Sequence, residues 1–175
     1  IDMFGAGWWK HDPEAAEKLL IKAGFEKKDD GWYFNGSKFT TEISYLADTE
    51  AQSARGAQAA YNQLQAFGLD CTITSKSTAT WVVDGGQGNY QIGTYWPSAG
   101  ILKDFYSAIS GWDSRLMKPL GETGSGQGAR WKNEKVDEIL TELAGVDPTS
   151  DKSYELHQEF LKEAVKEMPA INFLS

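Results

Sequence analysis

The segment from Thr94 to Gly100, Thr-Tyr-Trp-Pro-Ser-Ala-Gly, combines residue types that suit the binding of a small molecule. Pro97 cannot continue a strand and Gly100 frees the backbone, so the segment predicts a turn that presents the ring of Trp96. An exposed tryptophan is a favoured surface for a planar or apolar ligand, and neighbouring hydroxyl groups add hydrogen bonds. The alternative is that Trp96 belongs to the core and only ends a strand.

The titratable and nucleophilic side chains show no spacing that predicts catalysis. The two histidines, His11 and His157, have polar sequence neighbours, which indicates surface residues. Cys71 falls on the apolar side of a predicted strand, which indicates a buried structural cysteine rather than a nucleophile. A hydrolase triad needs a base beside its nucleophile, and no pattern supplies that pair. Catalysis by paired carboxylates stays open, because no pair among the many acidic residues stands out.

Sequence motifs for metals and phosphates are missing as well. The chain has no HExxH, CxxC or EF-hand pattern. Gly85-Gly86-Gln87-Gly88 lacks the Lys-Ser/Thr of a P-loop, and Gly124 to Gly128 has glycines at alternate positions, unlike GxGxxG. Both segments favour flexible loops, and we expect neither a metal nor a cofactor.

The composition excludes several classes of protein. The 175 residues carry a net charge of −8 without a cluster of Lys and Arg, which argues against nucleic-acid binding. The longest apolar runs are far too short to span a membrane. The single cysteine excludes an internal disulfide. The chain opens at Ile1 with no signal peptide, and we interpret it as a domain excised from a longer protein.

Periodicity and capping residues predict alternating helices and strands. The predicted elements are a helix at 12–23, a charged turn at 28–30, a hairpin of 32–34 and 39–46 around Asn35-Gly36, a helix at 49–67, a strand at 69–75, a short helix at 78–84, a strand at 90–96, helices at 101–109, 133–143 and 150–168, a strand at 170–174, and an irregular Gly-rich stretch at 111–130.

This order of elements predicts one α/β domain over residues 1–175. Helices should cover the faces of a central mixed sheet that contains 39–46, 69–75 and 90–96. The segment Thr94 to Gly100 then follows the carboxyl end of a strand, which is where ligands bind in such folds.

Six segments carry a resemblance to a known family. They are His11 to Phe25, which is similar to a DPEKAKKLLAEAGY helix, Phe39 to Tyr45, Gln63 to Cys71, Tyr90 to Ile109, Trp131 to Leu140, and Met168 to Ile171. In this order and spacing they resemble the family 5 extracellular solute-binding proteins of ABC importers, which take up oligopeptides, dipeptides, nickel complexes and cello-oligosaccharides.

The resemblance implies a fold and a role. It implies a lobe like those of type II periplasmic binding proteins, and specifically the second lobe of a larger two-lobed protein. The ligand of such a protein lies between the lobes, and the closed form is recognised by the membrane permease subunits of an ABC importer. We therefore expect an extracytoplasmic monomer that is not an enzyme and binds no nucleic acid.

The resemblance also implies site residues. It makes Trp96 the first candidate for a ligand contact, and the other candidates are Tyr95, Pro97, Ser98, Ala99, Gly100 and Trp131. Peptide-binding members carry an acidic residue three positions after the tryptophan, and some carry a basic residue three positions before it. Here these positions are Ala99 and Gly93, so both charged anchors are absent. A buried charge needs a partner, and an oligosaccharide is therefore favoured over an oligopeptide.

Two other functions remain as alternatives. One is a carbohydrate-active or other enzyme domain with unrecognised carboxylates. The other is a peptide sensor or chaperone-like binder built on the same fold.

Overall fold

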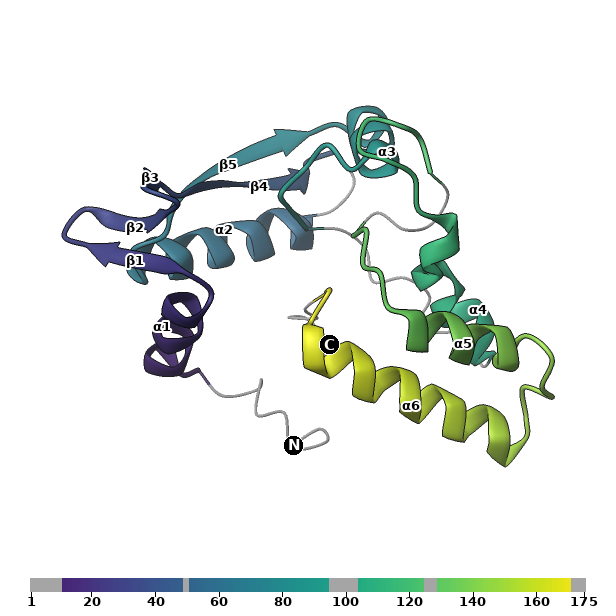
Figure 1. Cartoon of the computed structure of the whole chain (residues 1–175). Coiled ribbons are helices and arrows are strands. Elements are labelled where there is room, and N and C mark those ends of the chain that lie inside the picture. Colours follow the sequence, from purple (N-terminus) through teal and green to yellow (C-terminus); the bar gives the residue numbers. More distant parts are fainter. Residues whose placement is uncertain (1–10, 49–50, 95–103, 125–128, 171–175) are drawn as a thin grey trace. The chain divides into compact units, whose positions relative to one another are not determined.

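The computed structural model describes residues 11–48, 51–94, 104–124 and 129–170 (Figure 1). These residues divide into two compact units. We call the first the sheet unit; its described residues are 11–48, 51–81 and 90–94. The second is the helical unit, with described residues 82–89, 104–124 and 129–170. Within the described ranges, no helix has the length and apolar character needed to cross a bilayer.

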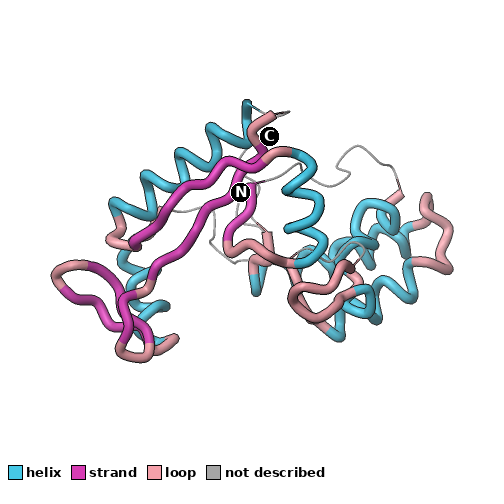
Figure 2. The backbone as a smooth tube through the Cα atoms, turned by 90° about the horizontal axis from the view of Figure 1, so that it is seen from above, coloured by secondary structure: helices cyan, strands magenta, loops and turns pink. Residues whose placement is uncertain are grey.

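The sheet unit is built on a parallel sheet with the strand order β5-β4-β6. Its strands are β4 (Thr40–Leu46), β5 (Asp70–Lys76) and β6 (Ile92–Thr94). β4 pairs with β5 from Thr40↔Asp70 to Leu46↔Lys76, and with β6 from Ile43↔Ile92 to Tyr45↔Thr94. The α/β fold and its three central strands are therefore confirmed. All described strands of this sheet are parallel, and antiparallel pairing is confined to a separate small sheet (Figure 2).

Helix α2 (Ala51–Ala66) packs against one face of this parallel sheet. Alternate strand residues point to that face, where Ile43 and Cys71 are buried against Ala57. Burial, with a smaller effect from the charge of Asp70, raises the pKa of the Cys71 thiol. The prediction of a buried structural cysteine is thus confirmed.

A small antiparallel sheet precedes the parallel one. It comprises β1 (Phe25–Lys28), β2 (Gly31–Phe34) and β3 (Ser37–Lys38). Positive φ angles at Asn35 (50°) and Gly36 (79°) form the predicted tight turn.

Two details of the predicted hairpin were wrong. Lys28 belongs to β1 rather than to a turn, because the ring of Phe25 packs 4.7 Å from that of Phe34 and 5.2 Å from that of Phe39. The strand that follows β2 in the hairpin is only the two-residue β3, since residues 40–46 pair in the parallel sheet instead, and the other side of β2 pairs with β1.

Helix α1 (Pro13–Lys22) confirms the first predicted helix. The Asp12 carboxylate accepts a hydrogen bond from the Ala15 N–H at 2.9 Å, and Pro13 occupies the first turn. None of its residues is fully buried, and Leu19 is half exposed. Among the described residues, α1 thus packs through partly buried side chains such as Leu20, and Asp12 stabilises its first turn.

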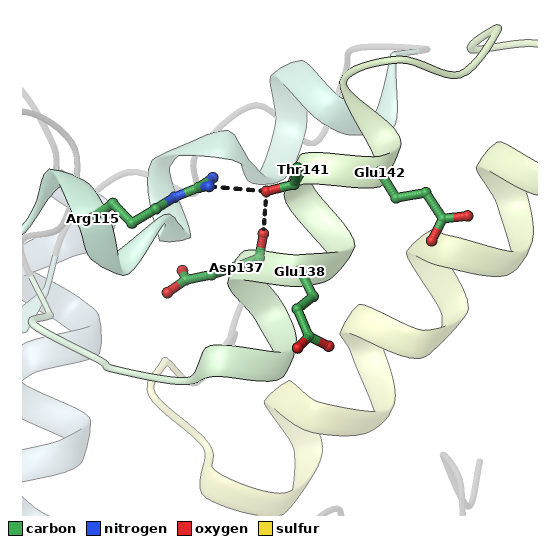
Figure 3. Close-up of a pocket in the computed structure, with 5 residues that line it drawn as sticks. All are labelled: Arg115, Asp137, Glu138, Thr141 and Glu142. Atoms are coloured by element: carbon green, nitrogen blue, oxygen red, sulfur yellow. Dashed lines mark hydrogen bonds between the residues drawn. The ribbon is translucent and has the colours of Figure 1, made fainter.

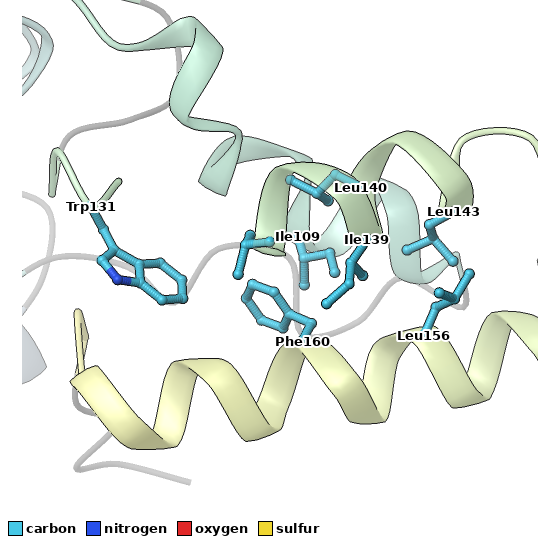
Figure 4. Close-up of a cluster of buried hydrophobic side chains, with 8 residues drawn as sticks. Ile109, Trp131, Ile139, Leu140, Leu143, Leu156 and Phe160 are labelled. Carbon is cyan, nitrogen blue, oxygen red and sulfur yellow. The ribbon is translucent and has the colours of Figure 1, made fainter. Parts of the chain in front are cut away.

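The helical unit is held by an apolar core between α4 (Phe105–Ile109), α5 (Glu134–Leu143) and α6 (Asp151–Glu167) (Figure 4). Its buried members are Ile109, Trp131, Val136, Ile139, Leu140, Leu143, Leu156 and Phe160. Asn133 caps α5 through the Val136 N–H, and Ser150 caps α6 through the Ser153 N–H. The starts of both predicted helices are confirmed.

The Gly85 to Gly88 segment differs from the predicted flexible loop, whereas residues 125–128 of the other Gly-rich segment lie outside the described residues. Helix α3 (Thr78–Gln87) begins in the sheet unit, ends in the helical unit and includes Gly85 and Gly86. The following Gly88 has a φ of 72°, and a Cβ atom there would lie 2.1 Å from the Arg130 guanidinium. Two 3-10 turns, η1 (Ser110–Trp112) and η2 (Ser114–Leu116), occupy part of the predicted irregular stretch.

Candidate functional site

The three parallel strands end at one edge of the sheet, which we call the carboxyl edge. Its described residues are Leu46 to Asp48 after β4, Lys76 to Thr78 after β5, and Thr94 at the end of β6. The Ala47 N–H donates to the Lys76 carbonyl at 3.0 Å, which extends the pairing of β4 and β5 by one residue. In open α/β sheets, ligands bind outside the carboxyl ends of the strands. This edge is therefore the candidate site.

A carboxylate at the edge is hydrogen-bonded to the start of a helix. The Asp48 carboxylate accepts hydrogen bonds from the Thr78 N–H at 3.0 Å and from the Thr78 hydroxyl at 2.7 Å. The hydroxyl bond, followed by the backbone bond, lowers the pKa of Asp48. The side chain thus anchors the start of α3 to the end of β4.

Two buried hydroxyl groups join α2 to the edge. Ser53, in the first turn of α2, donates to the Thr94 carbonyl at 2.9 Å, and the two hydroxyl oxygens lie 2.9 Å apart. Ser53 also accepts from the Leu46 N–H at 3.3 Å, and the Thr94 hydroxyl lies 3.2 Å from the Ser53 carbonyl. Both residues are buried, Thr94 at 4% exposure and Ser53 at 9%. The end of β6 is therefore fixed by side chains as well as by the strand ladder.

The other charged residue at the edge, Lys76, lies near a group of opposite charge. The Lys76 ammonium lies 4.0 Å from the Glu42 carboxylate, which accepts a hydrogen bond from the Ser44 hydroxyl at 2.8 Å. Of the described residues at the carboxyl edge, Asp48 and Lys76 are the charged ones, and each has its partner within the sheet unit.

An aromatic ring covers β6 on the face opposite α2. Gly93 pairs with Ser44, and a Cβ atom on Gly93 would lie 2.3 Å from the ring of Trp81 and 3.2 Å from that of Tyr90. Trp81 is buried, and its ring lies 5.3 Å from that of Tyr90. Glycine at position 93 therefore makes room for Trp81, so no side chain can project from this point of the strand.

The predicted site residues divide into two groups. Tyr95, Trp96, Pro97, Ser98, Ala99 and Gly100 lie outside the described residues, so their contact with a ligand stays a prediction. Trp131 lies in the helical core at 8% exposure, where its indole N–H donates to Glu167 at 2.5 Å. Its ring meets those of Trp112 and Phe160 edge-on. A ligand contact by Trp131 likewise stays a prediction, and its observed role is packing.

The sequence did not reveal Ser53 or Asp48 as residues of the edge. Their partners are 41 and 30 positions away, and serine or aspartate near a helix start usually indicates a local cap.

The helical unit carries a shallow hollow of about 360 Å³ lined by Arg115, Asp137, Glu138, Thr141 and Glu142 (Figure 3). Arg115 donates to Asp113 at 2.7 Å and to the Thr141 hydroxyl at 2.9 Å. Asp137 accepts from the Ser114 N–H at 2.8 Å. These bonds fasten η2 to α5, so the polar groups of the hollow have a structural role.

Catalytic constellations are not evident in the described part of the chain. His157 stacks on the ring of Phe105 at 4.2 Å, and burial lowers its pKa. Across the described ranges, no three His, Cys, Asp or Glu side chains gather in a way that would hold a metal ion.

Comparison with known proteins identifies related sequences and folds. The family model for bacterial extracellular solute-binding proteins, family 5 Middle, matches residues 2–119. No curated protein sequence matches the chain.

Solved structures share the fold at low sequence identity. A mannohexaose-bound periplasmic oligopeptide-binding protein of an ABC transporter from Thermotoga maritima is 20% identical with a TM-score of 0.75, over 91% of this chain and 30% of that one. AppA from Bacillus subtilis, in complex with a nonapeptide, is 13% identical with a TM-score of 0.69, over 91% and 31%. MelB from Agrobacterium fabrum, in complex with stachyose, is 14% identical with a TM-score of 0.68, over 91% and 25%. The chain thus spans about a third or less of the length of these proteins.

Proposed function

Because the chain belongs to the bacterial extracellular solute-binding proteins of family 5, we propose that residues 1–175 form the second lobe of a solute-binding protein of an ABC importer. The whole protein captures an extended, neutral oligomer between two lobes and presents it to the membrane permease subunits. An oligosaccharide is the favoured ligand and an oligopeptide the next. The protein acts outside the cytoplasm, as a monomer, and performs no chemistry on its ligand.

The observation that carries this proposal is the state of the carboxyl edge. Its described charges, Asp48 and Lys76, are already engaged within the sheet unit. Positions 93 and 99, a glycine and an alanine, supply no counter-charge for a charged end group of a peptide, and an unpaired buried charge is strongly unfavourable. Hydroxyl groups and the aromatic residues that follow Thr94 suit a neutral sugar better. The edge therefore supports a ligand recognised by stacking and neutral hydrogen bonds.

Gly93 supports the same ligand class. The ring of Trp81 fills the space that a side chain at this position would need. A cationic residue could not be accommodated there without displacing a buried tryptophan. Position 93 is therefore in contact with the apolar ring of Trp81 and provides no charged anchor for a ligand.

The related structures contain ligands of both classes. Mannohexaose and stachyose occur in two of them and a nonapeptide in a third. The shared fold is thus compatible with either class, and the choice for this protein depends on the side chains at its own edge. An enzymatic alternative finds no support in the described residues, where no base lies beside a nucleophile at the edge.

Calorimetry on the full-length protein tests the proposal. The probes are cellopentaose, mannohexaose and an uncharged-side-chain pentapeptide with free termini. We expect a sugar to bind at least ten-fold more tightly than the pentapeptide. Tight binding of the pentapeptide without binding of either sugar would contradict the proposed ligand class.

A variant pair tests the predicted contact of Trp96. Stacking of its ring buries roughly 100 Å², worth about 2 to 3 kcal/mol at ~25 cal/mol per Å², so Trp96→Ala should weaken binding about 30- to 150-fold. Tyr95→Ala is the matched control, because the sequence predicts both residues in one strand and neighbouring strand residues point to opposite faces of a sheet. Equal loss of affinity in both variants would mean that the ring of Trp96 has no special role.

A further inference from the structure

The turn between β2 and β3 combines a reactive dipeptide, Asn35-Gly36, with an open position in the fold. We propose that Asn35 is a site of spontaneous covalent modification, where the side-chain amide is lost and part of the product carries an isoaspartyl residue in the main chain. The inference is independent of the proposed function, because it involves neither a ligand nor a residue of the carboxyl edge.

The reaction consumes one water molecule and releases ammonia. The main-chain nitrogen of Gly36 attacks the side-chain carbonyl carbon of Asn35. The C–N bond of the side-chain amide breaks, and its NH₂ group leaves as ammonia with the proton that the Gly36 nitrogen gives up. Water then opens the resulting succinimide ring. Cleavage between the ring nitrogen and the side-chain carbonyl gives aspartate, and cleavage between that nitrogen and the main-chain carbonyl gives isoaspartate.

The structure leaves both reacting groups accessible. Asn35 and Gly36 are exposed, and a Cβ atom on Gly36 would meet nothing within 4 Å. Among the described residues, the side chain of Asn35 has no hydrogen-bond partner. Glycine leaves the attacking nitrogen unobstructed and permits the main-chain rotation that brings it to the side chain. Because β3 has only two residues, local opening of the turn costs little.

The other described asparagines are restrained. Asn62 and Asn133 each accept a hydrogen bond on the side-chain carbonyl oxygen, at 3.0 and 3.1 Å, and Asn89 donates one from its side-chain amide at 2.9 Å. Each is followed by a residue with a bulky side chain, which flanks the nitrogen that would attack. Position in the fold and sequence context therefore both favour Asn35.

The dipeptide Asp30-Gly31, at the other end of β2, is protected by its surroundings. Aspartate forms the same ring only from a protonated carboxyl group, which loses its oxygen as water. The Tyr33 hydroxyl donates to the Asp30 carboxylate at 3.1 Å, and the Lys38 ammonium lies 3.6 Å away. The bond from Tyr33, with a smaller effect from the charge of Lys38, lowers the pKa of Asp30. The carboxylate thus stays ionised, and the structure favours reaction at Asn35 over reaction at Asp30.

Modification should alter the main chain of the turn. A two-residue connection joins β2 to β3 because Asn35 and Gly36 adopt positive φ angles of 50° and 79°. An isoaspartyl residue adds a methylene group to the main chain, so the connection no longer matches the strands. Since β3 pairs with β2 at only two positions, we expect β3 to separate from β2, while the pairing of β2 with β1 remains.

The first test ages the full-length protein at mildly alkaline pH and follows each asparagine by peptide mapping. Deamidation at Asn35 should be about ten-fold faster than at Asn62, because glycine leaves the attacking nitrogen unobstructed. An isoaspartate-specific methyltransferase should label the peptide that contains residue 35 and not the one that contains Asp30.

Asn35→Gly is the matched control, because Gly-Gly also suits this turn and has no side-chain amide to lose. Its peptide should remain unlabelled. Deamidation of Asn35 no faster than that of Asn62, or equal labelling at Asp30, would overturn the inference.

Hydrogen exchange tests the structural consequence. The Phe39 N–H donates to the Trp32 carbonyl at 2.8 Å, directly after β3. Its exchange should be about five-fold faster in the isoaspartyl fraction, because β3 no longer holds this bond closed. Freshly prepared Asn35→Asp carries the new charge on an unaltered main chain and should exchange like the wild type. Unchanged exchange at Phe39 in the isoaspartyl fraction would show that β3 stays paired and would contradict this consequence.

Discussion

The two units of the chain are stabilised in different ways. The helical unit buries eight apolar side chains between its helices, including Trp131 and Phe160. The sheet unit has a smaller buried cluster of Ile43, Ala57 and Cys71 on the α2 face of its parallel sheet, and it fixes the carboxyl edge with polar bonds from Ser53 and Asp48.

The two kinds of interaction suit different tasks, which are the stability of a unit and the geometry of a binding site. Apolar packing is non-directional and scales with buried area, so it suits a unit that has to remain folded. Hydrogen bonds depend on direction and distance, so they suit an edge that must place a binding segment. The candidate site accordingly lies in the unit with the smaller apolar cluster.

Phe160→Ala tests this contrast between the two units, and it has the largest expected effect of the variants. Removal of this buried ring should destabilise the helical unit by about 3 to 5 kcal/mol, through lost transfer free energy and the cavity left behind. Hydrogen exchange should accelerate strongly in α5 and α6 and little in β4 and β5. Tyr154→Ala, on an exposed side of the same helix, should change stability by less than about 0.5 kcal/mol. Equal acceleration in both units would show that they unfold as one.

Gly93→Ala tests the packing behind the carboxyl edge. The added methyl group would lie 2.3 Å from the buried Trp81 ring, which has little freedom to move. We expect a loss of about 1 to 3 kcal/mol, seen as a lower denaturation midpoint. Gly111→Ala is the control, because a Cβ atom there meets nothing within 4 Å. If Gly93→Ala is as harmless as the control, the fit between Trp81 and β6 is looser than the structure indicates.

The stability of the helical unit should fall in mild acid, which is the smallest of the expected effects. Burial between aromatic rings lowers the pKa of His157 below its ordinary value of 6.5, so the unfolded chain takes up the proton more readily. The contribution of the neutral imidazole is complete above about pH 6.5 and is lost as the pH falls toward the lower folded pKa. The difference in the free energy of unfolding between wild type and His157→Gln should narrow as the pH falls from 7.5 to 5.0. A constant difference would contradict the effect of burial.

Local signals in the sequence predicted most of the elements. Asp12, Asn133 and Ser150 each cap a helix at the predicted place, because a cap requires only residues within the next turn. The turn at Asn35-Gly36 was predictable for the same reason, since both positions adopt positive φ angles. The carboxyl-edge location of Thr94 followed from the alternation of strands and helices.

Features that depend on distant residues were not predictable. Helix α3 continues through Gly85 and Gly86, although glycine favours the end of a helix. The 3-10 turn at Ser114–Leu116 is held by Asp137, which lies 23 positions away from Ser114. The same limitation applies to the site, where the pairing of Ser53 with Thr94 leaves no periodic trace in the sequence.

The central position of β4 in the sheet has a consequence for the order of folding. β4, α2 and β5 follow one another along the chain, so β4 and β5 can pair before β6 is available. β6 joins the other side of β4 only after the chain has passed through α3, about 50 residues beyond its partner in the register. During that interval the free side of β4 exposes unpaired backbone groups, which invite pairing with another chain. Late arrival of β6 thus leaves this side of β4 open to pairing with another chain until β6 has been added.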